Sequence, residues 1–307
     1  MHRHNCFRIL VSALLFSITL PAPAQRFVQT NSGPSTTAPG AASTWGIWAC
    51  TGCQFNGTYQ YIAGKFQQVT TPVPFLTISV GGGSVMQFDE VWATDFNNLI
   101  YRWDPYSQAF HQVAGSLTNI EIGEGYTACH QYEVWGTDVN HQVWRYNYCT
   151  FTWDSVPGFL NGLAVGGGEV WALNGYNEVF RYNPTSNAFD LMPGRLAQVA
   201  VGAGGVWGVG TDSSVWQFNP STQNWDQIPG QLDAISAGAD GVFGFFDVWQ
   251  YPNGPNQVLR LDPGARTWTT VFSVTGALTQ IGQVVVGTGA GTWMEAGLGF
   301  VYYYVTL

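Results

Sequence analysis

Charged side chains are scarce in this sequence, and basic ones are the scarcest. Only 9% of the 307 residues are charged, with 10 Lys and Arg against 19 Asp and Glu. Nucleic-acid binders need a basic surface, and so do proteins that dock on anionic membranes, so we expect neither partner. Disorder is excluded too, because it requires low hydrophobicity and high charge, whereas 46% of these residues are hydrophobic.

Long hydrophobic runs are also lacking, apart from one near the start. Residues 9–20 form an apolar run after Arg3 and Arg8, and Ala22 and Ala24 fit a small-x-small cleavage site. This pattern predicts a cleaved signal peptide over residues 1–24 and a secreted or periplasmic domain over residues 25–307. The alternative is an uncleaved anchor, for which the run is short. Cleavage removes two Arg and no acid, which moves the formal charge from −9 to −11.

Aromatic residues and glycines are abundant, and they recur in a repeat. Four segments align without a gap and share Val-Trp at the start, an Asp- or Asn-rich turn, an alternating apolar strand, and a Pro-Gly or Ala-Gly near the end; they begin at Val91, Val134, Val170 and Val206. Each unit reads as four short strands separated by turns, which predicts an all-β array. Fainter copies place further anchor aromatics at Trp45, Phe243 and Trp293.

Repeats of about 40 residues that each contain four short strands predict a β-propeller of four-stranded antiparallel blades. Seven anchors favour seven blades. The last unit holds only two strands, and the start of the mature chain can supply two more, so we expect the last blade to be closed by strands from both termini. The alternative is six blades preceded by a disordered leader.

The repeat resembles the tectonin family. The shared pattern is Val-Trp-Gly, then Ile/Val-Tyr/Trp-Arg-Trp/Tyr, then Trp-x-x-Val/Ile-Pro-Gly-x-Leu and Val-Gly, and the likeness covers about residues 45–300. The resemblance implies a lectin-like propeller that binds glycans or glycoconjugates, without catalysis or cofactor, at sites between or on top of blades. A surface protein is the alternative partner.

Arginine recurs at one place in the second strand of the unit, at Arg102, Arg145, Arg181 and Arg260. One interpretation is structural, with each guanidinium bonded to carbonyls or acids of the next blade. The other is an inter-blade pocket that grips sugar hydroxyls or carboxylates. The anchor tryptophans are expected in the core, with a sugar-stacking platform as the alternative.

Four cysteines remain after cleavage, which predicts two disulfides. Cys129 and Cys149 fall in loops that emerge on the same face of an up-and-down blade, and Cys50 and Cys53 flank a hairpin turn. Cys50 and Cys53 would supply only two ligands to a metal, and the sequence contains no second Cys-x-x-Cys to complete the site, so no metal site is expected.

A loop found in one unit only contains Cys129 and is the candidate ligand-contacting patch, because binding residues concentrate in loops on rigid scaffolds. The candidate contacts in and near this loop are Tyr126, His130, Tyr132, His141 and Tyr148.

Motifs of enzymes are missing. The sequence contains no G-x-S-x-G, no H-E-x-x-H and no Walker motif. We therefore expect a non-enzymatic protein. Two catalytic carboxylates that come together from different blades form no motif in the sequence, so a hydrolase or lyase with its site in the central channel is the alternative.

Overall fold

The chain folds entirely into antiparallel β-sheets in the part that the computed structural model describes. That part comprises residues 25–32, 36–39, 44–48, 57–62, 65–81, 90–125, 129–130, 132–202, 204–238, 241–246, 256–274, 281–286, 292–296 and 300–306. No helix occurs among these residues. The predicted signal peptide, Tyr126, Cys50 and Cys53 lie outside them.

Six sheets each consist of four consecutive strands joined in sequence order. The first three are β2 (Thr36–Pro39), β3 (Thr44–Trp48), β4 (Gly57–Ile62) and β5 (Lys65–Val69); β6 (Phe75–Gly81), β7 (Glu90–Asp95), β8 (Leu99–Asp104) and β9 (Ala109–Ser116); and β10 (Asn119–Glu124), β11 (Tyr132–Thr137), β12 (Gln142–Asn147) and β13 (Thr152–Phe159). The next three are β14 (Gly162–Gly166), β15 (Glu169–Leu173), β16 (Glu178–Asn183) and β17 (Ala188–Arg195); β18 (Gln198–Gly202), β19 (Gly205–Val209), β20 (Ser214–Asn219) and β21 (Asn224–Gln231); and β22 (Ala234–Gly238), β23 (Gly241–Phe246), β24 (Asn256–Asp262) and β25 (Thr267–Val274).

A further sheet combines the two ends of the chain. It contains β26 (Ile281–Val286), β27 (Thr292–Ala296) and β28 (Phe300–Thr306), and β1 (Gln25–Ser32) pairs with β28 as the fourth strand. Strands from both termini therefore meet, as expected, but one comes from the N-terminal side and three from the C-terminal side. The expected division of two and two is wrong because β26 pairs directly with β27 and belongs to this sheet.

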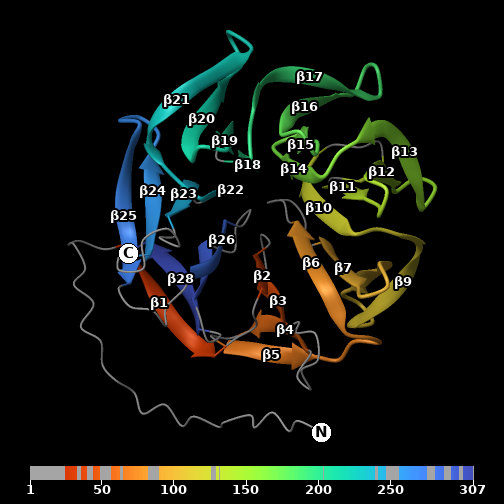
Figure 1. The fold of residues 1–307 in the computed structure, drawn as a ribbon. Helices are drawn as coiled ribbons and strands as arrows, with labels where there is room; N and C mark the ends of the chain where they lie inside the picture. Colours follow the sequence, from red (N-terminus) through yellow and green to blue (C-terminus); the bar gives the residue numbers. More distant parts are fainter. Residues whose placement is uncertain are drawn as a thin grey trace, which may run out of the picture.

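The sheets form a ring (Figure 1), and the first strand of each consecutive set lies nearest its centre. This arrangement confirms the predicted propeller of four-stranded antiparallel blades. The sheets are offset by one strand from the sequence repeat, because each Gly-rich tail turns back onto the next Val-Trp strand. Between β14 and β15 the turn is only Gly167 and Gly168, with φ of 55° and 76°. A two-residue turn of this kind joins neighbouring antiparallel strands.

The anchor aromatics pack between neighbouring sheets. Burial is described for five of them, and all five are buried: Trp92, Trp135, Trp171, Trp207 and Phe243. The Trp135 ring lies 4.6 Å from Tyr182 and 6.0 Å from Phe189, both in the next sheet. The prediction that these residues form the core is confirmed.

The outer strands contact one another through the Pro-Gly motif. Gly194 has a φ of 91°, and a Cβ at this position would lie 3.2 Å from Cδ1 of Trp225 in the next sheet. The Trp225 indole also donates a hydrogen bond to the Pro193 carbonyl at 2.8 Å. Gly115, Gly158 and Gly230 repeat the positive φ and the contact with an aromatic of the next sheet. The repeat thus keeps glycine where the following aromatic must approach the backbone.

Candidate functional site

Three sheets place a glutamate beside the anchor tryptophan. The residue two positions before each Trp is Glu90, Glu133 or Glu169, and alternation along a strand puts both side chains on one face. Each indole N–H donates to the carboxylate, at 2.7 Å from Trp92, 2.9 Å from Trp135 and 2.6 Å from Trp171.

An arginine on the adjacent strand completes the group. The register pairs Trp92 with Arg102, Trp135 with Arg145 and Trp171 with Arg181. A guanidinium Nη2 then donates to the glutamate carboxylate at 3.0 Å in all three sheets. We call each set a Glu–Trp–Arg cluster; the three are Glu90–Trp92–Arg102, Glu133–Trp135–Arg145 and Glu169–Trp171–Arg181.

Arg102 and Arg145 lie at the boundary with the following sheet. The Arg102 guanidinium is 5.3 Å from the ring of Tyr148, and the Arg145 guanidinium is 5.9 Å from the ring of Tyr182. Their acidic partners, however, belong to their own sheet. The interpretation that these arginines bond acids is confirmed for the three clusters, but its placement of the acids in the next blade is wrong. The next sheet supplies aromatic faces, which attract cations.

Solvent reaches the arginines about equally and the glutamates unequally. Side-chain exposure is 31%, 28% and 35% for Arg102, Arg145 and Arg181, and 8%, 13% and 36% for Glu90, Glu133 and Glu169. Each cluster therefore offers a part-exposed donor, and only the last offers an equally exposed acceptor.

The fourth copy of the unit loses both charges together. Gly205 stands in the glutamate position and Gln217 pairs with Trp207 in the arginine position. The Trp207 indole donates instead to the Gly202 carbonyl at 3.4 Å. A half-buried charge is costly without a partner, which favours the loss of both charges together in this copy.

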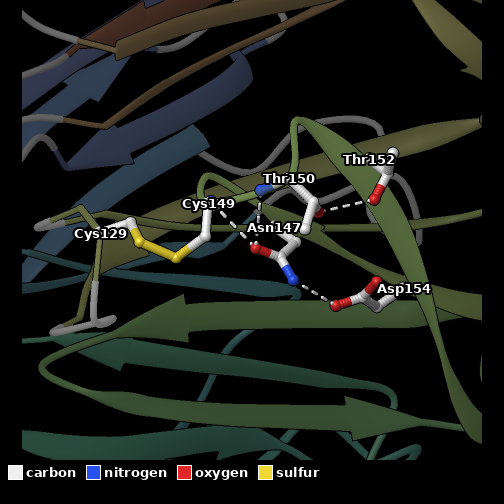
Figure 2. Close-up of a disulfide and its surroundings, with 6 residues drawn as sticks. All are labelled: Cys129, Asn147, Cys149, Thr150, Thr152 and Asp154. Carbon is white, nitrogen blue, oxygen red and sulfur yellow. Dashed lines mark hydrogen bonds between the residues drawn. A yellow bond between two sulfur atoms is a disulfide. The ribbon is translucent and has the colours of Figure 1, made fainter.

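The predicted disulfide between Cys129 and Cys149 is present, with Cα atoms 5.4 Å apart. Figure 2 shows it beside the β12–β13 turn, where the Asn147 side chain accepts hydrogen bonds from the backbone N–H groups of Cys149 and Thr150 and donates to Asp154 at 2.8 Å. Cys129 lies before β11 and Cys149 lies between β12 and β13, so the two loops that they link are at the same end of the sheet. We call this end of the sheets the disulfide end. The Glu–Trp–Arg clusters lie toward the disulfide end.

Two rings stack next to the disulfide. His130 follows Cys129 and Tyr148 precedes Cys149, and their rings are 3.8 Å apart with an interplanar angle of 7°. His130 Nε2 also lies 4.0 Å from the Glu90 carboxylate. Burial lowers the pKa of His130, with Glu90 opposing the shift and Arg102 adding to it. The disulfide therefore holds a histidine over the first cluster.

The other candidates that the structure describes, Tyr132, Tyr148 and His141, do not form one exposed patch. Tyr132 and Tyr148 are buried. His141 is exposed but sits in the β11–β12 turn, with a φ of 62°, at the opposite end of β11 from His130. The expectation that proximity in sequence brings His141 to His130 is wrong, because β11 separates them.

Sequence reasoning missed the three glutamates. A signal was present: Glu-Val-Trp occurs at residues 90–92, 133–135 and 169–171, with Arg ten residues after each Trp. In the turn after β7, the Asp95 carboxylate accepts from the backbone N–H groups of Asn97 and Leu99, both at 2.8 Å, as is usual for an acid that stabilises a turn.

A family model described as the tectonin domain matches residues 40–188 and 84–284. The chain belongs to the tectonin domain family. No curated protein matches this tectonin chain.

Solved structures similar to it are propeller-like across nearly its whole length. "YCF48 bound to D1 peptide" has a TM-score of 0.62 and 15% identity, covering 94% of this chain and 100% of that one. The RRP9 WD40 repeats have a TM-score of 0.61 and 11% identity, covering 95% and 100%. A chain of the mitotic checkpoint complex has a TM-score of 0.63 and 10% identity, covering 100% and 99%. At these identities the likeness shows the fold alone.

Within the described residues, no group of three or more His, Cys, Asp or Glu side chains could hold a metal ion. The same residues include no helix with the length and apolar character of a membrane span.

Proposed function

We propose that this tectonin protein is a secreted, non-catalytic, carbohydrate-binding propeller of seven blades. The observation that carries the proposal is the repetition of the Glu–Trp–Arg cluster, with its part-exposed guanidinium, at one end of three adjacent sheets. Repeated, equivalent sites suit multivalent binding, in which several weak contacts add up to useful avidity.

The chemistry of the cluster fits sugar hydroxyls. A hydroxyl can accept from a guanidinium N–H and donate to a carboxylate oxygen, and each cluster offers both groups about 3 Å apart. Neighbouring rings such as Tyr182 provide aromatic surface for C–H groups of a pyranose.

The blade number and localisation belong to the same proposal. Six sheets of consecutive strands and the mixed sheet of β1 and β26–β28 support seven blades, the last closed by both termini. The signal-like residues 1–24 support secretion. N-terminal sequencing of protein recovered from the culture medium or periplasm should begin at Gln25; intact Met1 would contradict secretion by cleavage.

A glycan array tests the binding proposal. The mature, oxidised protein should bind a related set of glycans, and the Arg145→Gln/Arg181→Gln variant should bind them more weakly while remaining folded at the temperature of the array. A folded wild-type protein that binds no glycan would refute the proposal.

A protein-binding scaffold is the second candidate, and the opposite end of the ring supplies the observation for it. Phe96, Val139 and Tyr176 are exposed large side chains in the corresponding turns β7–β8, β11–β12 and β15–β16. Exposed apolar groups at equivalent positions are typical of interaction surfaces. Capture of a peptide-library ligand that is lost on substituting all three with Ser would support this candidate.

A further inference from the structure

Each cluster arginine is already neutralised by the chain itself. Arg102 makes two bonds to Glu90, and Arg145 and Arg181 each make one at 3.0 Å to Glu133 and Glu169. A guanidinium paired with a carboxylate keeps N–H donors for a ligand, but the pair as a whole has no net charge. The cluster is therefore a neutral donor–acceptor pair rather than an anion site.

The fourth copy supports the view that the pair acts as one unit. Gly205 and Gln217 replace both charges there, and no described copy retains the glutamate without the arginine, although the Phe243 copy keeps Arg260 with Gly241 in the glutamate position. By sequence, none of the other anchors, Trp45, Trp207, Phe243 and Trp293, has Glu two residues before it. The number of complete clusters is thus three, fewer than the number of sheets.

The overall charge of the chain is unfavourable for an anion. The chain has a single lysine, Lys65, and a formal charge of −9. Arg195 contacts Glu178 at 3.5 Å and the Tyr176 carbonyl at 3.1 Å. An acidic ligand would meet a repulsive field and would have to displace a carboxylate from its guanidinium.

From these observations we infer that the clusters select uncharged, hydroxyl-rich saccharides over acidic ones, and that the Glu169–Trp171–Arg181 cluster is the principal site. This inference rests on the proposed carbohydrate-binding function. A neutral pyranose accepts from the guanidinium and donates to the carboxylate, so both partners must be reachable.

The ranking follows from the exposure of the glutamates. Arg181 and Glu169 are equally open, at 35% and 36%. Glu133 is 13% exposed and Glu90 only 8%, with His130 4.0 Å away from Glu90. A ligand therefore reaches both halves of the pair best at Glu169, less well at Glu133 and least at Glu90.

Paired glycans provide the test. The probes are a neutral oligosaccharide that the wild type binds on the array and the same core carrying a sialic acid, a uronic acid or a sulfate. The neutral form should bind at least about tenfold more tightly, a difference of about 1.4 kcal/mol. Its affinity should change little between 0.05 and 0.5 M salt, since screening acts on charges.

Three matched variants copy the natural uncharged copy and so should fold: Glu169→Gly/Arg181→Gln, Glu133→Gly/Arg145→Gln and Glu90→Gly/Arg102→Gln. Titration calorimetry should show the largest loss of binding from the first and the smallest from the third. The reverse substitution Gly205→Glu/Gln217→Arg should add binding, and it reports on the cluster even where a loss variant fails to fold. The φ of Gly205 lies outside the left-handed region, and the nearest atom to an added Cβ is the Trp207 indole N at 3.3 Å.

The outcomes separate this inference from the proposal beneath it. Preferential binding of the acidic glycans, or equal effects of all three loss variants, would overturn the inference and leave glycan binding intact. A folded protein that binds neither glycan class would overturn both.

Discussion

Removal of Arg145 alone should destabilise the fold more than removal of Arg145 and Glu133 together. In the wild type the Glu133 carboxylate accepts from Arg145 at 3.0 Å and from Trp135 at 2.9 Å, and it is 13% exposed. Arg145→Gln leaves this carboxylate with the indole as its remaining strong partner. Glu133→Gly/Arg145→Gln leaves no buried charge and matches the arrangement around Trp207.

The magnitude follows from partial burial. A fully exposed ion pair contributes about 0.2–1 kcal/mol, and breaking a buried one costs about 3–5 kcal/mol. With Arg145 28% exposed and Glu133 13% exposed, we expect Arg145→Gln to cost about 1–3 kcal/mol, in the range for a charged group that loses a hydrogen bond. The double variant should recover part of this loss, even after the cost of the new glycine is counted.

Urea unfolding of the two single variants and the double variant forms a double-mutant cycle. The predicted coupling free energy is about 1 kcal/mol or more. Additivity within about 0.3–0.5 kcal/mol would refute the claim that the pair acts as a unit.

Three further perturbations have defined outcomes. Gly194→Ala should lower the melting temperature, with a cost of about 1–3 kcal/mol, because φ is 91° and Trp225 lies 3.2 Å from the new Cβ. Cys149→Ser, which opens a loop with a sequence separation of 20, should cost about 3 kcal/mol in chemical unfolding. Burial raises the pKa of Glu121 to about 7; its ordinary value is 4.5, so the wild type should lose stability relative to Glu121→Gln as pH rises from about 5 to 8.

Each of these predictions has a control or a contradicting result. Gly167→Ala changes a glycine with φ of 55° and nothing within 4 Å of its Cβ, so it should cost less than Gly194→Ala; an equal cost would exclude the Trp225 contact as the cause. Unchanged unfolding of Cys149→Ser would contradict the disulfide contribution. Parallel pH profiles for wild type and Glu121→Gln would show that Glu121 titrates alike in the folded and unfolded states.

The sequence contains most of the architecture, because the repeated features are local. Val-Trp strands, Asx turns and Pro-Gly ends have fixed spacing, and they led to the four-stranded sheets and to the buried Trp135 and its equivalents. The sequence did not show which strand of the repeat begins each sheet. The Gly167–Gly168 pair reads as a boundary between units, yet its positive φ values make it a hairpin within one sheet.

The candidate site was only half visible in the sequence. The arginines stood out because they recur, but their partners lie twelve residues earlier on the neighbouring strand, and only the register brings Arg145 to Glu133. The pairing of Cys129 with Cys149 followed from loop geometry. The placement of His141 failed because nearness in the chain does not fix the end of a strand at which a turn lies.

The most direct test of the account is calorimetric titration of one neutral glycan into the mature, oxidised protein and into Glu169→Gly/Arg181→Gln. We expect saturable, salt-insensitive binding to the wild type and a loss of at least about tenfold in affinity, or of one site in the stoichiometry, for the variant, which should remain folded at the titration temperature. Binding of equal affinity and stoichiometry to a folded variant would contradict the assignment of this cluster as the sugar-binding site.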